Sequence, residues 1–394
     1  MAGLLEGIRV VDLSRVLAGP LCAMILGDLG AEVIKVEQPG QGDETRAWGP
    51  PYIGGESAYY LCANRNKKSI TLDLRHEEGR RILRELICRS DVLIENFRLG
   101  TMERWGLSYE DLEALHPRLV YCRISGYGPE GPDRDRPGYD FIIQAESGLM
   151  SITGPVEGPP MKVGVAIVDV VAALYATIAI LGALLERQRS GRGQRIEISL
   201  LECALASLVN VASNYLVSGQ PPQRYGNAHP NIVPYEAFET ADGYVVICVG
   251  NDRQFRTLCR CLGMDELAED PRFATNPGRV KHREELLPLL RQALRRRSTS
   301  EWLEILIPAG VPCGAVRTIQ EALSQPGSHG MIVEVHHPTA GRVRMVRSPI
   351  RLSRTPTIVK RHPPRLGEHT EEVLSQLLSV SAAEAARLRE QGII

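Results

Sequence analysis

Asp169 is a lone carboxylate at the start of the most apolar stretch of the sequence. Residues 170–185 carry no charge, and such a run predicts a buried helix that begins near Asp169. An aspartate in the first turn of a helix is often a cap for the free N–H groups there. Those N–H groups also favour the ionised carboxylate, and an ionised, partly desolvated carboxylate is a competent nucleophile toward an activated acyl group. Both roles are open from this residue alone.

Polar and basic residues follow the expected strands. Asn96-Phe97-Arg98 comes directly after the expected strand 91–95, and Arg104 follows soon after. Ligands of open α/β sheets bind beyond the carboxyl ends of the strands, and the planar fork of arginine suits phosphate. Phe97 could cover an adenine face. The alternative is an ordinary solvated basic surface.

Composition limits the class of protein. The chain has 394 residues, more than a single core of about 250–300 residues usually holds, so we expect two domains. Hydrophobic residues make up 43% and charged residues 24%, as in globular enzymes. The net charge of -1 gives no overall field that would recruit nucleic acid or a membrane. Any anion must therefore be held by local basic groups.

The nine cysteines favour a reducing compartment. Their number is odd, no Cys-x-x-Cys pair occurs, and most stand in apolar stretches. The N-terminus has neither a basic region nor a long apolar core, so we expect no signal peptide. The uncharged run of 16 residues is shorter than the roughly 18 that a membrane span needs. These features predict a cytoplasmic protein in which residues 170–185 form a core helix.

The positioning elements alternate between strand and helix in the first half of the chain. We expect strands at 8–13, 31–37, 91–95, 119–125 and 195–200, and helices at 20–29, 77–90, 108–115, 169–187 and 202–217. Such alternation predicts βαβ units and a mainly parallel sheet. The fold class is therefore α/β, with a Rossmann-like parallel-sheet large domain.

A second, smaller α+β domain is expected beyond a linker. Residues 218–229 are rich in Pro, Gly and polar side chains. A hairpin at 235–249 and helices near 253–262, 282–297 and 301–308 follow, the last with a capping box of Ser298 and Glu301. We expect the large domain at 1–217, the linker at 218–229, the small domain at 230–330, and a return to the large domain at 331–394.

Several common motifs are missing. No G-x-G-x-x-G follows the first strand, where residues 16–20 stand instead, and no Walker loop, G-x-S-x-G or H-E-x-x-H occurs. His336 and His337 are adjacent on an expected strand, so they point to opposite faces. We therefore expect no bound metal.

Seven segments together resemble the class III CoA-transferase family (formyl-CoA transferase-like, CaiB/BaiF). They are Asp12–Pro20 (DLSRVLAGP), Gly27–Glu37 (GDLGAEVIKVE), Asn66–Ile70 (NKKSI), Glu95–Arg98 (ENFR), Pro159–Gly164 (PPMKVG) with Asp169, Gly191–Gln194 (GRGQ) and Leu366–Thr370 (LGEHT). They run in order over essentially the whole chain, and jointly they are specific.

The resemblance implies a fold, an assembly and a nucleophile. The large domain would be built from both ends of the chain, and two subunits would thread through each other as an interlocked homodimer. The substrates would be an acyl-CoA, with coenzyme A as cosubstrate, and a carboxylic acid. Asp169 takes the place of the family's nucleophilic aspartate. The positions implied to contact CoA are Leu17, Ala18, Leu72, Asp73, Leu74, Arg75, Asn96, Phe97, Arg98, Arg104, Pro137, Gly138, Tyr139 and Asp140.

Departures from the family pattern reduce the range of candidate substrates. Formyl-CoA transferases carry Gln where Leu17 stands and Arg where Gln38 stands, and their Gly-rich lid is replaced here by residues 249–252. The stretches at 226–235 and 250–255 are most similar to the succinyl-CoA:glutarate-type branch, which moves CoA between dicarboxylates. We therefore expect transfer from an acyl-CoA, with succinyl-CoA foremost, to a dicarboxylic acid through aspartyl anhydride and aspartyl-CoA thioester intermediates.

Three further residues are expected to serve the acid substrate and the closure of the site. Arg15 stands in a strand-to-helix turn and is a candidate partner for a distal carboxylate, the alternative being a plain surface arginine. Gly250 and Asn251, at the end of the expected hairpin, are candidates for closing the site against water.

Two other functions stay open. The 2-methylacyl-CoA racemases resemble this fold but use a His in the turn where Tyr139 stands here. Tyrosine, with a reference pKa of about 10, takes an α-proton poorly at neutral pH, which favours transfer. A non-catalytic CoA-binding protein is the second alternative, and the intact Asp169 speaks against it.

Overall fold

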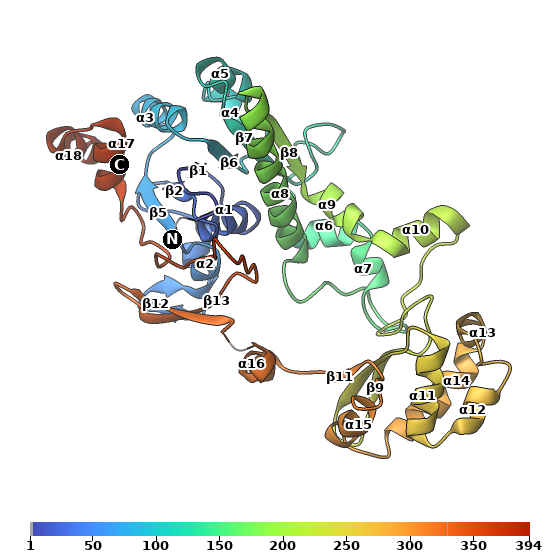
Figure 1. Ribbon diagram of the computed structural model, residues 1–394. Helices are drawn as coiled ribbons and strands as arrows, with labels where there is room; N and C mark the ends of the chain where they lie inside the picture. The colour runs from blue at the N-terminus through green and yellow to red at the C-terminus, as the bar shows by residue number, and fades with distance from the viewer. Residues whose placement is uncertain (1–2, 329) are drawn as a thin grey trace. The chain divides into compact units, whose positions relative to one another are not determined.

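The computed structural model describes residues 3–328 and 330–394. The chain forms two compact units (Figure 1). The first contains the chain up to residue 149 together with 163–217 and 330–394, and the second contains 150–162 and 218–329. The expected boundaries put residues 150–162 in the large domain, whereas their contacts group them with the second unit.

The first unit is built around a parallel sheet of six strands. Short runs rich in Val and Ile form most of the strands, as is typical of sheets buried on both faces. The order is β5 (Lys67–Thr71), β2 (Glu32–Glu37), β1 (Arg9–Asp12), β6 (Val92–Glu95), β7 (Val120–Ser125) and β8 (Arg195–Ser199). Every neighbouring pair is parallel. The predicted α/β class with a parallel sheet is confirmed.

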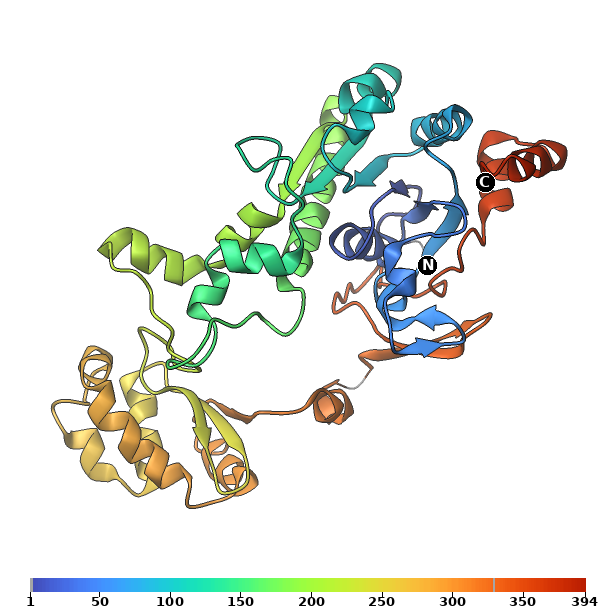
Figure 2. The same ribbon diagram turned by 180° about the vertical axis from the view of Figure 1, so that it is seen from behind.

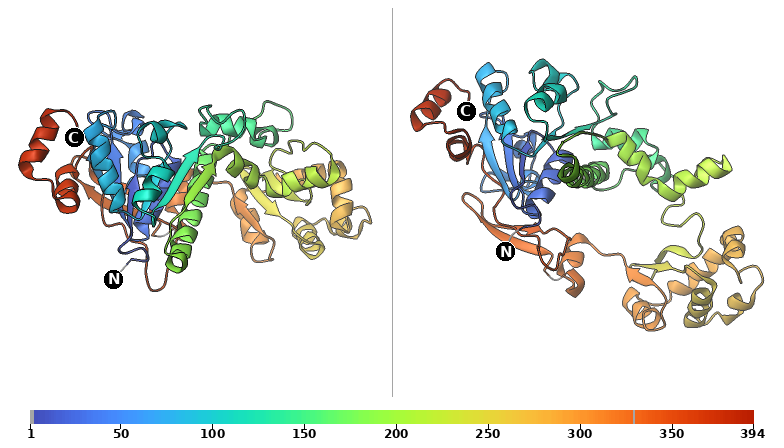
Figure 3. Two further views of the ribbon diagram at one scale, coloured as in Figure 1. Left: turned by 90° about the horizontal axis from the view of Figure 1, so that it is seen from above. Right: turned by 45° about the horizontal axis from the view of Figure 1, so that its top comes forward.

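Helices cover both faces of this sheet. On one face lie α1 (Ala18–Asp28), α8 (Ile167–Ser190) and α9 (Leu200–Ser207). On the other lie α3 (Glu77–Cys88), α5 (Tyr109–Leu115), α17 (Thr370–Leu378) and α18 (Ala382–Glu390). Figure 3 shows the C-terminal helices beside α3, away from α8. Both ends of the chain therefore contribute to one unit.

α8 is longer than the uncharged run predicted. It has 24 residues, and by length and composition alone it could cross a membrane, as core helices of the same composition also could. The expectation that this helix is too short to span a membrane was therefore wrong. Its small residues Ala172, Ala173 and Ala176 are buried against α1 and the sheet, whereas Ile178 is 65% exposed. One face of α8 lies in the core and the opposite face is apolar and uncovered.

The helix expected at 202–217 is two helices. α9 ends at Ser207 and α10 (Val209–Ser218) continues at an angle of 75°. Val209 has φ of +38°, a value that a β-branched residue rarely adopts. The prediction of one continuous helix was wrong because neither Gly nor Pro marks the break.

The C-terminal segment completes the β5 edge of the sheet. The N–H of His369 donates to the carbonyl of Ser69 at 2.8 Å, and Thr370 Oγ1 accepts from the N–H of Thr71 at 3.0 Å. Nearby, the hairpin of β12 (Ile332–His337) and β13 (Gly341–Val346) packs on Leu61 of α2 (Ala58–Cys62) (Figure 2). Residues some 300 positions apart thus share one edge.

The second unit has a core of its own. Its antiparallel sheet has the order β11 (Cys313–Ala315), β10 (Tyr244–Cys248) and β9 (Tyr235–Glu239). The helices of its core are α11 (Asp252–Leu262), α12 (Asp265–Glu269), α13 (Asn276–Lys281), α14 (Arg283–Leu294) and α15 (Thr299–Leu306). The predicted hairpin and the capping box of Ser298 and Glu301 are confirmed.

Arg224 ties residues 150–162 to this second unit. Its guanidinium donates to the carbonyls of Pro155 at 3.1 Å and Gly158 at 2.7 Å. The remaining short elements of the chain are η1 (Glu44–Ala47), β3 (Tyr52–Ile53), β4 (Glu56–Ser57), α4 (Thr101–Arg104), α6 (Asp140–Glu146), α7 (Leu149–Ile152), α16 (Ile319–Ser324) and η2 (Pro326–Ser328).

Candidate active site

The loop between β1 and α1 and the first residue of α1 carry three predicted site residues, Arg15, Leu17 and Ala18. Asn96 holds this loop: its Oδ1 accepts from the N–H of Arg15 at 2.9 Å, and its Nδ2 donates to the Arg15 carbonyl at 2.8 Å. Val16 has φ of +72°, and its N–H donates to Asp43 Oδ1 at 3.3 Å. The first turn of α1 begins here without a side-chain cap from Leu17, so its N–H groups lack the partner that a polar N-cap would supply.

A close approach of two glycines places the predicted turn 137–140. Gly126 directly follows β7, and a Cβ on it would lie 2.6 Å from the Cα of Gly138. A side chain at either position would push the two segments apart. The turn therefore lies at the carboxyl end of β7, the edge at which ligands bind in such sheets.

A cleft of about 380 Å³ brings most of the predicted residues together. We call it the Asp169 cleft. The predicted residues that line it are Arg15, Leu17, Ala18, Asn96, Phe97, Arg98, Pro137, Gly138, Tyr139 and Asp169. They come from the ends of β1, β6 and β7 and from the start of α8.

A second cleft of about 320 Å³ shares three of those residues, Arg15, Phe97 and Arg98. We call it the Leu72 cleft. The other predicted residues that line it are Leu72, Asp73, Leu74 and Arg75. Its apolar wall includes Phe97 and Trp105, whose rings meet edge to face at 5.2 Å. The two clefts together offer a wall for a flat aromatic group and a path toward Asp169.

Asp169 is the third residue of α8 and is half-buried. Burial and the neighbouring Asp140 raise the pKa of its carboxyl from 3.8 to about 7. Among the residues that the structure describes, none donates a hydrogen bond to this carboxylate. The expectation that helix N–H groups keep Asp169 ionised was therefore wrong.

Asp140 takes those N–H groups instead. Its Oδ1 accepts from the N–H of Val168 at 2.8 Å and from that of Asp169 at 3.4 Å. It is buried, and it does not line either cleft. Asp140 was predicted to contact CoA, but in this structure it is only 9% exposed and caps α8.

Arg15 and Arg98 line both clefts and give each of them positive charge. Arg98 is exposed, and within the described part of the chain its guanidinium has no hydrogen-bond or ion-pair partner. Arg15 pairs with Glu44 at 3.1 Å, with both side chains nearly half exposed, and lies 5.5 Å from the centre of the Phe97 ring. Arg98 can therefore bind an anion directly, whereas Arg15 must first release the carboxylate of Glu44.

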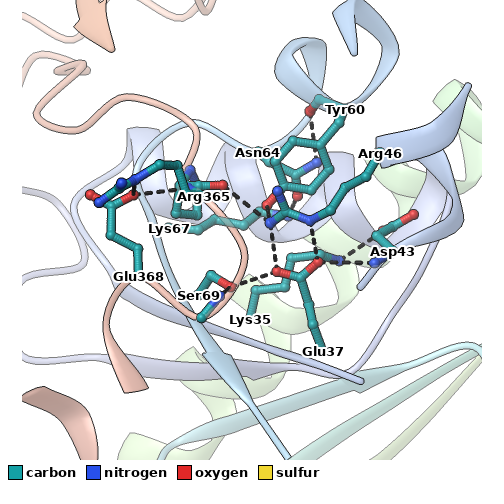
Figure 4. A network of polar contacts seen from close by, with 12 residues as sticks. Lys35, Glu37, Asp43, Arg46, Tyr60, Asn64, Lys67, Ser69, Arg365 and Glu368 are labelled. Atoms are coloured by element: carbon teal, nitrogen blue, oxygen red, sulfur yellow. Dashed lines mark hydrogen bonds and ion pairs between the residues drawn. The ribbon is translucent and has the colours of Figure 1, made fainter. Parts of the chain in front are cut away.

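Buried charges that the sequence did not single out support the loop from below. Figure 4 shows Lys35 of β2 pointing toward Asp43. Lys35 Nζ lies 2.9 Å from Asp43 Oδ2 and donates to the Ser14 carbonyl at 2.7 Å. Burial lowers the pKa of Lys35, but Asp43, Asp12 and Glu37 outweigh it and the net change is upward. The charged residue inside a Val- and Ile-rich strand was the signal that could have found this support.

A second set of contacts continues this network. Arg46 pairs with Glu37 at 2.8 Å and donates to the Tyr60 hydroxyl at 2.6 Å, and Ser69 Oγ donates to Glu37 at 2.6 Å (Figure 4). These contacts join β2, β5 and η1 beneath the Leu72 cleft, where Glu37 and Asp43 are also wall residues.

The remaining predicted residues lie outside both clefts. Arg104 ends α4 and donates to Thr101 Oγ1 at 3.0 Å, and Thr101 lines the Leu72 cleft. Asn251 caps α11 by accepting from the N–H of Gln254, and the N–H of Gly250 donates to Gln254 Oε1 at 2.9 Å. Gly250 and Asn251 belong to the second unit, so their part in closing the site stays a prediction.

The family model for CoA-transferase family III matches residues 5–370. The chain belongs to CoA-transferase family III. It is 42% identical to succinyl-CoA:glutarate CoA-transferase from Homo sapiens over 392 residues, which covers 99% of this chain and 90% of the relative. It is 45% identical to succinate–glutarate CoA-transferase from Agrobacterium fabrum over 384 residues, which covers 95% of this chain and 96% of the relative.

Solved structures agree with this assignment to family III. A CaiB/BaiF family protein from Brucella suis superimposes with a TM-score of 0.85 at 44% identity, covering 96% of this chain and all of that one. The predicted family and enzyme class are confirmed. This family III member is a CoA-transferase.

Proposed function

We propose that the enzyme transfers CoA from succinyl-CoA to a dicarboxylic acid, glutarate foremost, through covalent intermediates on Asp169. The observation that carries this proposal is the position of Asp169 on the wall of a cleft that also presents the unpaired Arg98 and the Phe97 ring. Relatives named for succinate and glutarate support the choice of acids.

The first half of the reaction forms an enzyme-bound thioester. A carboxylate oxygen of Asp169 attacks the thioester carbonyl; the new C–O bond forms, the C–S bond breaks, and the electron pair leaves on sulfur as CoA thiolate. The thiolate then attacks the aspartyl carbonyl carbon. The anhydride C–O bond to the first acid breaks, and that acid leaves as its carboxylate.

The second half repeats these steps with the acceptor. Its carboxylate attacks the aspartyl thioester and expels thiolate, and the thiolate takes the new acyl group from the anhydride, which frees Asp169. A carboxylate nucleophile suits this exchange because an anhydride is close enough in free energy to a thioester for the acyl group to be transferred in both directions. The N–H groups at the start of α1, which receive no side-chain cap from Leu17, suit the oxyanion of each tetrahedral step.

Arg15 is proposed to bind the distal carboxylate of the acid. It lines the Asp169 cleft, and its partner Glu44 is a half-exposed surface group. Exposed ion pairs of this kind contribute about 0–1 kcal/mol, so a substrate carboxylate can replace Glu44 at small cost. Gly250 and Asn251 are proposed to help exclude water, because water would hydrolyse the anhydride.

We also propose an interlocked homodimer and a cytoplasmic location. Apolar side chains stand exposed on α8 and α10 of the single chain. They are Leu174 (48%), Ile178 (65%), Leu185 (57%), Leu216 (79%) and Val217 (89%). Uncovered apolar surface of this kind favours a partner subunit. All nine cysteines are free thiols, which supports a reducing compartment. The two units are proposed to be the large and small domains.

An exchange assay tests the function. The enzyme is mixed with succinyl-CoA and isotopically labelled glutarate, and mass spectrometry follows labelled glutaryl-CoA. Exchange without deuterium uptake at C2 of a 2-methylacyl-CoA supports transfer. Deuterium uptake without exchange identifies a racemase, and neither reaction identifies a CoA-binding protein; either result rejects the proposal. Citramalate, malate and itaconate complete the acceptor screen.

A further inference from the structure

The first turn of α8 is capped by a residue from another helix. The residue at its N-cap position, Ala166, has no polar side chain. Asp140, the first residue of α6, supplies the missing acceptor through its Oδ1, which lies 2.8 Å from the Val168 nitrogen and 3.4 Å from the Asp169 nitrogen. The cap is therefore the carboxylate of Asp140, which the backbone N–H groups of Val168 and Asp169 hold beside the Asp169 side chain.

Gln144 fixes the other oxygen of Asp140. Its Nε2 donates to Asp140 Oδ2 at 2.6 Å, one turn along α6, and its Oε1 accepts from the N–H of Val163 at 2.9 Å. Gln144 is fully buried. Both oxygens of Asp140 are thus engaged as acceptors, as in an ionised carboxylate, and the carboxylate cannot turn away from Asp169.

This arrangement leaves the negative charge of the Asp169 carboxylate without hydrogen-bond donors from the described residues to stabilise it. The N–H groups that normally stabilise an anion at a helix start point to Asp140. Burial first, and then the negative charge of Asp140, raise the pKa of Asp169 to about 7. Tyr59 of α2 also faces this pair, and burial together with Asp169 raises the pKa of its hydroxyl to about 12, so it stays neutral. The other charged wall residues are Arg15, Glu44, Arg98, Arg134, Asp135 and Arg136.

We propose that Asp140 is a positioning residue whose fixed negative charge destabilises ionised Asp169 relative to its acylated forms. This inference rests on the proposed function. When Asp169 attacks the thioester, its negative charge passes through the new C–O bond to the departing sulfur, so the aspartyl anhydride is neutral. The aspartyl-CoA thioester is neutral too. Each acylation thus removes one of two neighbouring charges, which favours the covalent intermediates, and a more basic carboxylate is also a better nucleophile.

The first test is the pH profile of Asp140→Asn. Asparagine keeps an acceptor oxygen for the N–H groups of α8 but carries no charge. We expect the acidic limb of kcat/KM, which follows ionisation of Asp169, to move about one pH unit downward. We also expect kcat above pH 8 to fall about tenfold, because the carboxylate is less basic. Asp140→Ser, which is also a good cap without charge, should move the limb in the same direction.

Gln144→Leu is the matched control. The amide nitrogen that Asp140→Asn introduces would face the Nε2 of Gln144, so Asp140→Asn also loses the hydrogen bond to Gln144. Gln144→Leu loses the same bond but keeps the Asp140 charge, so its acidic limb should stay at the wild-type pH although its stability falls. An equal shift in Gln144→Leu, or an unmoved limb in both Asp140 variants, would overturn the inference.

A trapping experiment separates this inference from the proposed function. Wild-type enzyme and Asp140→Asn are incubated with succinyl-CoA alone and treated with borohydride, and the modification of Asp169 is measured by mass spectrometry. We expect the trapped fraction in Asp140→Asn to be several-fold lower. A wild type that is never modified would reject the covalent function itself. A modified wild type with an equal trapped fraction in Asp140→Asn would reject only the role of Asp140.

Discussion

Lys35 donates a hydrogen bond from its buried ammonium to the backbone carbonyl of Ser14 at 2.7 Å, one residue before Arg15. A side chain of the central sheet thus fixes the loop that lines the Asp169 cleft. Asp43 completes the support, since it pairs with Lys35 at 2.9 Å and accepts from the N–H of Val16. The strained loop is over-determined by its surroundings, as loops at functional sites commonly are.

Removal of the Lys35 charge should damage both stability and catalysis. Lys35→Met leaves Asp43 as a buried carboxylate without its partner, which costs about 3–5 kcal/mol. The loosened loop should lower kcat/KM at least tenfold. The double variant Lys35→Met/Asp43→Asn removes both charges and should recover part of the stability in urea unfolding. If the double variant is less stable than Lys35→Met, the two charges are not coupled as the structure has them.

Asp169→Asn should be more stable than the wild type above neutral pH. The unfolded chain releases this proton near pH 3.8, whereas the folded protein holds it up to about 7. Stability contributed by the protonated form is therefore lost as pH rises through this window. Asparagine does not ionise, so the variant should gain about 1–3 kcal/mol at pH 8 and nothing near pH 3.5. Urea unfolding at both pH values measures the gap, and a gap independent of pH would contradict the prediction.

Arg15→Ala should discriminate between acceptor acids. The KM for glutarate should rise about tenfold, the loss of one charge-assisted contact of about 1.5 kcal/mol, while the KM for a monocarboxylate of similar length stays within about twofold. Glu44→Gln is the matched variant, because it frees Arg15 and should lower the KM for glutarate. Equal losses for both acids would reject the assignment of Arg15.

Arg98→Ala should weaken acyl-CoA binding with little effect on kcat. Its guanidinium is exposed in both clefts, and one phosphate contact corresponds to about a tenfold rise in the KM for succinyl-CoA. The control is Arg81→Ala, which removes an exposed arginine of α3 that pairs with Glu78. The wild-type KM should rise with salt more steeply than that of Arg98→Ala. If the KM for succinyl-CoA rises equally with salt in the wild type and in Arg98→Ala, Arg98 does not contact a phosphate of the substrate.

Ile178→Glu should disrupt the proposed homodimer. The side chain is 65% exposed in the single chain, on the outer face of α8. A charge there is harmless in water and costly in an apolar interface. Light scattering should give a dimeric mass for the wild type and a monomeric mass for the variant. Leu115→Glu, at a 57% exposed position of α5, should leave the mass unchanged; a monomeric wild type would reject the assembly.

Local patterns predicted β1, β2, β6, β7 and β8 and the main helices of the sheet, but not the edge strand β5, whose sequence KKSIT carries two lysines. Runs of Val and Ile between Gly, Pro and polar residues specify β1, β2 and β6 because burial on both faces needs little more than apolar side chains. The bend at Val209 could not be predicted this way. It depends on a positive φ that no Gly, Asn or Pro announces, so tertiary packing must decide it.

Some site residues could be predicted from local patterns, and others depend on contacts between distant segments. Asn96 and Arg98 follow the end of β6, and a rule about strand ends places them at a cleft. Tyr139 was predicted only from the resemblance to the family, and the contact of Gly126 with Gly138 brings its turn to the same edge. The contact of Asp140 with the α8 N–H groups joins α6 to α8, which are separated in the sequence by residues 147–166, including α7. No spacing rule covers such a contact, so the sequence could not show that Asp169 would lack donors.

The buried charges of β2 were hidden for a similar reason. Alternation predicts a strand at 31–37, but it does not reveal that Lys35 and Glu37 face a protein interior. Their partners Asp43 and Arg46 come from η1 and its cap. The C-terminal residues 361–370 then close over β5. Only the folded chain brings these segments together.

The closure of β5 by His369 and Thr370 has a consequence for synthesis on the ribosome. Strand β5 is made early, yet the groups that satisfy Ser69 and Thr71 are made about 300 residues later. Until then the nascent sheet presents an open hydrogen-bonding edge, the kind of edge that recruits other strands. The β5 edge of the sheet is therefore completed only after the C-terminal segment has been made and has docked on it.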